Sequence, residues 1–271
     1  MDLLSNMKVN IILPHNENCQ EKKIGPVAQV VLNNHHYSKL GFEETIFGMS
    51  SREKVNFQNF FEIKKDIWSL FGKGFSFCKA IKKIIKDDHE LYIIEIHNRP
   101  NYFNYFSFDN KKLKKVLYLH NDPRDMKGLR TKEERIRFIN KIDMIIVISE
   151  YIKSCYLDEI KDLSYSKKIS VVHNGIDRWI DNKPRKENLV IFSGRLNDDK
   201  GIYELIQALD ITLPKFPKWK AIIFGRKDRN VNLKIYELMS KNRQIIFMGE
   251  KENSVVKKFL EKAAISCVPS K

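Results

Sequence analysis

One stretch of the sequence combines glycine and basic residues in an order suited to binding a diphosphate. It runs Phe192-Ser193-Gly194-Arg195 and continues, five residues after the arginine, with Lys200-Gly201 at the head of an amphipathic segment. A helix start offers free N–H groups to an anion, and the guanidinium and ammonium groups add opposite charge. The pattern predicts that Gly194, Arg195 and Lys200 bind phosphate, with a solvated charged loop as the alternative.

Histidine-asparagine pairs follow several of the predicted strands. His97-Asn98 and His120-Asn121 come directly after apolar runs, and His173-Asn174 follows a third run. In an open α/β sheet, ligands bind outside the carboxyl ends of the strands. A single histidine at such a place more often packs than reacts, but two equivalent pairs favour a functional edge. Asn98, His120 and Asn174 are therefore candidate site residues.

A lone glycine, Gly25, precedes the first predicted helix. Glycine allows a ligand to approach the backbone closely, and the helix that follows is expected to offer free N–H groups to an anion. An ordinary loop glycine is the alternative interpretation.

Short apolar runs that alternate with amphipathic segments must position these residues. Such alternation predicts strands and helices in turn, and apolar strands without a polar face require helices on both sides of a parallel sheet. The expected strands are 9–13, 44–47, 92–96, 116–119, 144–148 and 170–172. The expected helices are 27–39, 75–86, 131–141 and 150–159. We therefore predict a doubly wound α/β domain.

A polar stretch at 181–188, which contains Pro184, interrupts this pattern before it starts again. Such stretches are typical of domain boundaries, so we expect domains at 1–182 and 183–271. In the second domain, strands are expected at 189–193, 220–224, 245–248 and 265–268, and helices at 202–213, 233–241 and 254–263. That domain would end on a strand without a covering helix, so we expect a C-terminally truncated chain.

Composition excludes several classes of protein. The 271 residues are 42% hydrophobic and carry a net charge of +15, which suits a folded chain of about two domains rather than a disordered or collagen-like one. No run of roughly 18 apolar residues occurs, and residues 1–10 lack the order of a secretory signal, so we expect a cytoplasmic protein. The four cysteines are too scattered for a zinc or redox pair and are expected to be buried free thiols.

The motif from Val171 to Asp177, together with Phe192-Ser193-Gly194-Arg195 and Lys200-Gly201, resembles the signature of the retaining nucleotide-sugar glycosyltransferases of GT-B fold, family four or group 1. The runs from Ile94 to Pro100 and from Leu119 to Gly128 are similar to bacterial members that build lipopolysaccharide or other surface glycans. The resemblance implies two Rossmann-like domains that face a cleft, with the acceptor in the first domain and the nucleotide sugar in the second.

The resemblance also implies roles for individual residues. Arg195 and Lys200 match the pair that neutralises the departing diphosphate without a metal ion or other cofactor, and fixed cations help most where negative charge develops. His120 matches a histidine that reaches the donor sugar, and Gly25 matches a first loop near the donor phosphate. Asn98, Asn174 and Gly194 complete the expected donor-binding set.

Members of this family carry two glutamates, spaced as Glu-x7-Glu, just beyond the strand that here leads to Pro269-Ser270. The glutamates bind the donor sugar and ribose. If the 271 residues are the entire polypeptide, we expect little or no transfer. If they are a partial sequence, we expect the full enzyme to continue for roughly another 80 to 120 residues.

Three partners remain possible for the net positive charge: an anionic substrate, an anionic membrane and nucleic acid. We expect a hexosyltransferase that acts on a glycan or lipid-linked acceptor, such as lipopolysaccharide core, with peripheral membrane contact. A non-catalytic nucleotide-sugar-binding remnant is the next interpretation. Scattered lysines without a recognisable module disfavour nucleic acid, and no Gly-x-Gly-x-x-Gly follows a strand, which disfavours a nicotinamide dehydrogenase.

Overall fold

The computed structural model describes residues 7–20, 23–38, 43–49, 59–64, 72–85, 92–106, 113–175, 184–226 and 241–271. The chain divides into two compact units, Met1–Asp177 and Arg178–Lys271. Each unit is described by itself. The boundary expected after residue 182 lies outside the described residues.

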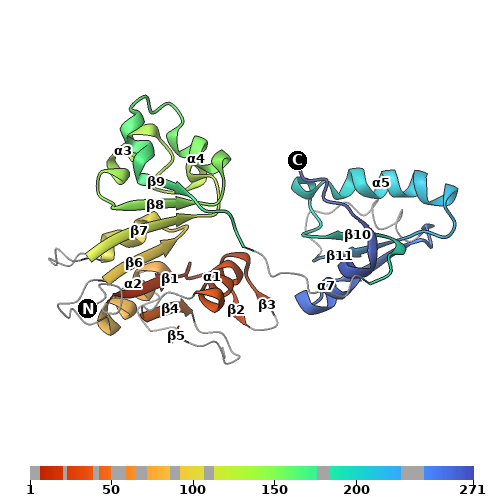
Figure 1. Cartoon of the computed structure of the whole chain (residues 1–271), viewed down its shortest axis with the longest axis horizontal. Coiled ribbons are helices and arrows are strands. Elements are labelled where there is room, and N and C mark those ends of the chain that lie inside the picture. Colours follow the sequence, from red (N-terminus) through yellow and green to blue (C-terminus); the bar gives the residue numbers. More distant parts are fainter. Residues whose placement is uncertain are drawn as a thin grey trace. The chain divides into compact units, whose positions relative to one another are not determined.

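The first unit contains a seven-stranded sheet in the order β5-β4-β1-β6-β7-β8-β9 (Figure 1). Every pair of neighbouring strands is parallel, as the apolar runs predicted. The strands are β1 (Lys8–Ile12), β4 (Glu43–Met49), β5 (Phe60–Ile63), β6 (Tyr92–His97), β7 (Leu113–Leu119), β8 (Met144–Val147) and β9 (Ile169–Val171). β5 and a small hairpin of β2 (Cys19–Gln20) and β3 (Lys23–Ile24) were not predicted.

Four helices of the first unit overlap the segments that the sequence predicted, and two of them begin one or two residues earlier. They are α1 (Pro26–Tyr37), α2 (Lys73–Ile84), α3 (Lys132–Ile139) and α4 (Glu150–Leu157). Local capping explains where two of them begin. Thr131 and Glu134 form a capping box at the start of α3, and the Ser149 side chain accepts the Ile152 N–H at the start of α4.

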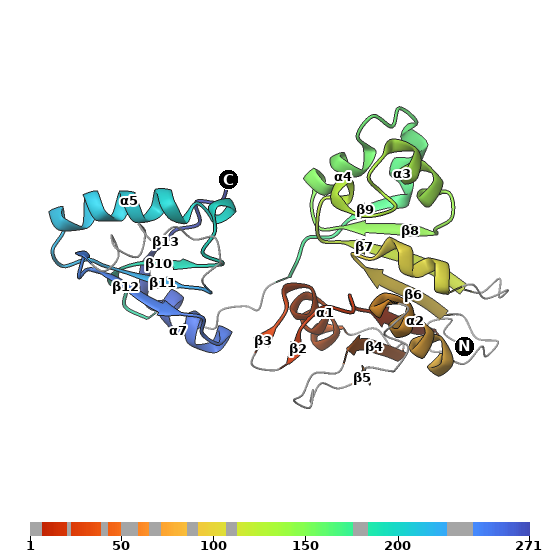
Figure 2. The same cartoon turned by 180° about the vertical axis from the view of Figure 1, so that it is seen from behind.

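Helices cover both faces of this sheet (Figures 1 and 2). Alternate residues of β1 point to opposite faces. Ile12 therefore packs in a core with Phe77 and Ile81 of α2, whereas Val9 and Ile11 join a core with residues of α1. The unit is thus doubly wound, as predicted.

The strand order reverses at β1, whose neighbours are β4 and β6. In doubly wound sheets such a switch point opens a crevice at the carboxyl ends of the strands, where ligands bind. The residues that follow β1, β6 and β7 therefore occupy the expected binding edge of the first unit.

The second unit is a parallel four-stranded sheet in the order β12-β11-β10-β13. Its elements are β10 (Glu187–Ser193), α5 (Ile202–Thr212), β11 (Lys220–Phe224), β12 (Ile245–Gly249), α7 (Asn253–Lys262) and β13 (Ala263–Ser266). Residues of α5 pack on one face of β10 and residues of α7 on the other. The strand order reverses at β10, and the helix predicted at 233–241 falls on residues of which 233–240 are not described.

The cysteines of the chain are free thiols, as predicted, and Cys19, Cys78 and Cys155 are buried. Within the described ranges, none of the helices combines the length and apolar character needed to cross a bilayer.

Candidate functional site

Two glycines shape the loop that follows β10. The Gly194 N–H donates to the Phe224 carbonyl at 3.1 Å, so this loop lies against the end of β11. Gly225 adopts a φ of 148°, and a Cβ at that position would stand 1.8 Å from the Gly194 carbonyl oxygen. Only glycine allows this backbone contact, which fixes the conformation around Arg195.

The structure brings Gly194, Arg195 and Lys200 together, as the sequence predicted. Lys200 Cγ lies 4.0 Å from the position that a Cβ on Gly194 would take. The Arg195 side chain is exposed and Lys200 is half-buried. Among the described residues, neither cation has a carboxylate within ion-pair distance.

Nearby carboxylates are engaged elsewhere. Lys271 Nζ lies 2.6 Å from Asp198 Oδ1 and 2.8 Å from Glu204 Oε1. The bond to Lys271 lowers the pKa of the Glu204 carboxyl. Lys271 therefore balances the charge of one of these two acids. Arg195 and Lys200 form no ion pair with either acid, so both cations can bind a phosphate.

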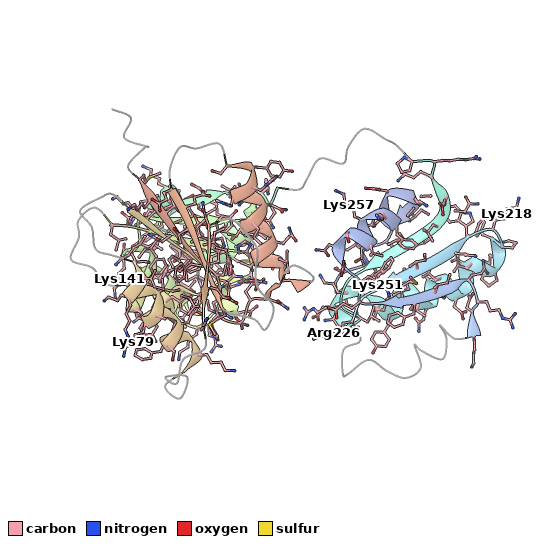
Figure 3. The ribbon with its side chains drawn as sticks, turned by 90° about the horizontal axis from the view of Figure 1, so that it is seen from below. Lys79, Lys141, Lys218, Arg226, Lys251 and Lys257 are labelled. Atoms are coloured by element: carbon pink, nitrogen blue, oxygen red, sulfur yellow. The ribbon has the colours of Figure 1, made fainter. Side chains whose placement is uncertain are left out.

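Arg226 is a further cation at this edge that the sequence analysis missed. The Leu196 N–H donates to the Arg226 carbonyl at 3.1 Å, so the loops after β10 and β11 run side by side. Figure 3 shows Arg226 at one end of the second unit and Lys218 at the opposite end. The sequence did contain a signal for Arg226, because a Gly-Arg pair directly follows each of the strands β10 and β11.

Polar side chains also converge at the switch point of the first unit. After β1, the Asn16 amide oxygen accepts from Arg99 at 2.7 Å, which bridges the ends of β1 and β6. The Tyr102 hydroxyl accepts the His15 N–H at 3.0 Å and lies 2.6 Å from His15 Nδ1. Burial, followed by the charges of Arg99 and Lys73, lowers the pKa of His15, so any positive charge at this edge comes from Arg99 and Lys73 rather than from His15.

His97 and His120 meet at the ends of β6 and β7. His97 Nδ1 lies 2.8 Å from His120 Nε2, and His97 Nε2 lies 2.8 Å from Glu95 Oε1. Burial, and then the neighbouring His97, lowers the pKa of His120 to about 3. His120 is therefore a neutral imidazole at physiological pH.

The Asn98 amide is used within the first unit. It donates to Asn121 Oδ1 and accepts the His120 N–H, each at 2.8 Å. Asn98 adopts a φ of 53°, a left-handed conformation that asparagine tolerates better than most residues. These bonds make Asn98 a brace between the two strand ends, and its contact with a donor stays a prediction.

Asn174 is exposed just after β9. The neighbouring His173 ring lies 3.0 Å from the Ile148 carbonyl oxygen through Nδ1, which anchors this segment at the end of β8. Asn174 thus stands at the carboxyl edge of the sheet, and its donor-binding role stays a prediction.

The start of α1 differs from the expectation of free N–H groups beside Gly25. The Glu17 carboxylate accepts the N–H groups of Val27 and Ala28 at 3.0 and 3.2 Å. A Cβ on Gly25 would stand 2.1 Å from Glu17 Oε1. Gly25 therefore makes room for an internal carboxylate, because Glu17 lies in the connection after β1, which the sequence pattern did not place against the helix.

Within the described part of the chain, no group of three or more His, Cys, Asp or Glu side chains is arranged to hold a metal ion. That the reaction needs no metal stays a prediction.

Residues 174–271 match the family model Glycosyl transferases group 1. This match contains Gly194, Arg195 and Lys200. Among curated protein sequences, none matches the chain significantly.

Solved structures resemble the chain at low sequence identity. The chain is 22% identical to a TarM mutant from S. aureus in complex with Fondaparinux, alpha-GlcNAc-glycerol and UDP, with a TM-score of 0.55 over 73% of this chain and 40% of that one. The lipopolysaccharide outer core galactosyltransferase WaaB is 16% identical, with a TM-score of 0.64 over 97% and 74% of the two chains. An E. coli trehalose-6-phosphate protein bound with UDP-2-fluoro glucose is 12% identical, with a TM-score of 0.61 over 96% and 78%.

These likenesses establish the α/β GT-B fold. The chain spans 40% of the length of the TarM chains that it matches.

Proposed function

We propose that the protein is a retaining hexosyltransferase that moves a sugar from a nucleotide-diphosphate donor to a glycan or lipid-linked acceptor. The observation that carries this proposal is the loop of Gly194, Arg195 and Lys200 within the region matched to Glycosyl transferases group 1. Two cations without carboxylate partners among the described residues suit a diphosphate, whose negative charge grows as the sugar leaves. UDP or a UDP-sugar in two of the structural neighbours supports the donor class.

The acceptor is proposed to bind the first unit. Arg99 and Lys73 bring positive charge to the switch-point edge, which suits an acceptor that carries phosphate or carboxylate groups. Likeness to the galactosyltransferase WaaB supports lipopolysaccharide core as the acceptor class.

Contact with an anionic membrane is proposed through α2. This helix contains Lys73, Lys79, Lys82 and Lys83 and no acidic residue, and Ile84 beside them is 36% exposed. A lysine near an anionic surface contributes about 1 kcal/mol. Charge reversal at Lys82 and Lys83 should reduce co-sedimentation with phosphatidylglycerol vesicles, whereas reversal at Lys218 and Lys220 of the second unit should not.

The direct test is a screen of UDP- and GDP-sugars by calorimetry and by mass spectrometry of transfer products. We expect one nucleotide class to bind, and we expect the R195A/K200A double variant to lose that binding. Equal binding by the double variant would refute the donor site. The anomeric configuration of the product, read by NMR, tests retention: a product with the inverted configuration would refute that part of the proposal.

A further inference from the structure

A cluster of three rings and one carboxylate lies on the α1 face of the first sheet. Successive strand residues point to opposite faces, so Glu95 and His97 of β6 share a face, as do Tyr118 of β7 and His120 just beyond it. His97 pairs with Tyr118 in the parallel register. The backbone register therefore dictates that these four side chains meet.

The two imidazoles are joined edge to edge, because a ring nitrogen of each lies 2.8 Å from the other. Their planes are tilted by 26°. The Tyr118 ring lies nearly parallel to both, with its centroid 4.9 Å from His97 and 4.8 Å from His120. The His97 side chain is 1% exposed, so the His97 ring cannot rotate freely.

The hydrogen-bond partners determine which ring nitrogen of His97 and of His120 carries the hydrogen. A carboxylate only accepts, so Glu95 holds the hydrogen of His97 on Nε2. The Nδ1 of a neutral His97 then carries a lone pair and accepts from His120. His120 must therefore carry its hydrogen on Nε2, which leaves its Nδ1 as an acceptor. A carboxylate orients the imidazole in the same way in catalytic triads.

Burial, and then His97, favours the neutral His120 ring. The other groups that face the two imidazoles are Glu95 from β6, which contacts His97, the Tyr118 phenol from β7, and Asn34 of α1 close to that phenol. Burial, and then Glu95, raises the pKa of Tyr118, so the phenol stays uncharged. The Asn98 side-chain oxygen accepts the His120 backbone N–H at 2.8 Å, which fixes the position of the backbone from which the His120 ring extends.

We propose that Glu95 and His97 are positioning residues that hold His120 with its hydrogen on Nε2 and present its Nδ1 as a hydrogen-bond acceptor to a hydroxyl of the substrate. Among the described residues, His120 Nδ1 has no hydrogen-bond partner. An uncharged acceptor nitrogen binds an O–H group and is repelled by phosphate oxygens. The role of this pair therefore rests on the proposed function, and it assigns His120 to a substrate hydroxyl rather than to a phosphate group.

The first test reads the hydrogen positions directly in the full chain. In histidine labelled with ¹⁵N, long-range NMR spectra distinguish a ring protonated on Nε2 from one protonated on Nδ1. We expect the Nε2-protonated form for His120 in the wild type from pH 6 to pH 8. A His120 ring protonated on Nδ1 in the wild type would overturn the proposal. That result would follow if His97 were charged and donated to His120 Nε2.

The second test uses the E95Q and H97Q variants. Glutamine can both donate and accept, so each variant releases the constraint, and His120 should become a mixture of tautomers. An unchanged wild-type spectrum in both variants would overturn the proposal. The E44Q variant is the matched control, because Glu44 pairs with His35 elsewhere in the same unit and its loss should leave the His120 signals unchanged.

Kinetics separate this proposal from the proposed function. E95Q and H97Q should lower kcat/KM about tenfold, the equivalent of one lost hydrogen bond. E95D, which keeps the carboxylate, should restore part of the rate. An unaltered kcat/KM in both variants would contradict the positioning role. Correct tautomers without binding of any sugar nucleotide would instead refute the proposed function and leave the hydrogen-bond assignment intact.

Discussion

Loss of either cation in the loop after β10 should weaken nucleotide binding by a defined amount. Two opposite charges 4 Å apart interact by about 1 kcal/mol in water and about 4 kcal/mol at an effective dielectric constant of 20. Arg195 is exposed and Lys200 is half-buried, so the lower part of that range applies. We expect R195A and K200A each to cost about 1–2 kcal/mol, or a roughly 5- to 30-fold rise in the Kd for UDP or GDP.

The assay is isothermal titration calorimetry with UDP and GDP at low and high salt. The K218A variant is the control, because Lys218 is exposed at the end of the second unit opposite Arg226 (Figure 3) and its loss changes the net charge equally. Added salt should weaken wild-type binding more than binding by R195A, because screening acts on the charge that the variant lacks.

Two results would refute the reasoning. If R195A and K200A bind the nucleotide as the wild type does, then the loop does not bind the diphosphate. If K218A weakens binding as much as they do, then net charge rather than the geometry of the loop attracts the ligand. Circular dichroism of each variant establishes that the second unit is still folded.

Three further predictions concern other parts of the chain. R226A should raise the Kd for the nucleotide about 3- to 10-fold, as measured by calorimetry, because Arg226 follows the strand beside Arg195; an unchanged Kd would exclude it from the site. R135M should lower the free energy of unfolding by about 2–4 kcal/mol in urea, because the buried Arg135 guanidinium donates to the carbonyls of Leu129, Arg130, Tyr156 and Asp158; a loss below about 1 kcal/mol would contradict this. Burial lowers the pKa of His120 in the folded state to about 3, whereas an unfolded histidine titrates near 6.5. The contribution of His120 to the free energy of unfolding is therefore present above about pH 6.5 and is lost as the pH falls, because only the unfolded state takes up the proton. Wild type should therefore lose about 2 kcal/mol more than H120Q between pH 7.5 and pH 5 in urea unfolding, and equal losses would contradict the shift.

Local patterns in the sequence predicted most of the elements. Strands such as Met144–Val147 are continuous apolar runs, and α5 follows a glycine turn with apolar residues at helical spacing. The Gly-Arg loop was predictable for the same reason, because Gly194, Arg195 and Lys200 lie within seven residues at a strand-to-helix turn. The hairpin of β2 and β3 was missed because its strands, of two residues each, are too short to show a period, and β5 was missed as well.

Residues far apart in the sequence set the rest of the candidate site. His97 and His120 were both visible as strand-end histidines, but the role of Glu95 depends on the parallel register of β6 and β7. Likewise, Glu17 reaches the start of α1 across the intervening hairpin, so the N–H groups beside Gly25 are already bonded.

By itself, the sequence determined the α/β class, the Gly-Arg loop after β10 and the strand ends that carry histidine and asparagine, because these depend on periodicity and on residues close along the chain. Only the tertiary structure decided that Arg226 lies beside that loop, that Glu17 caps α1, and that Glu95 contacts His97 and His97 contacts His120. The physical reason is that strand order and register result from packing between distant segments, and they bring together side chains that no local pattern connects.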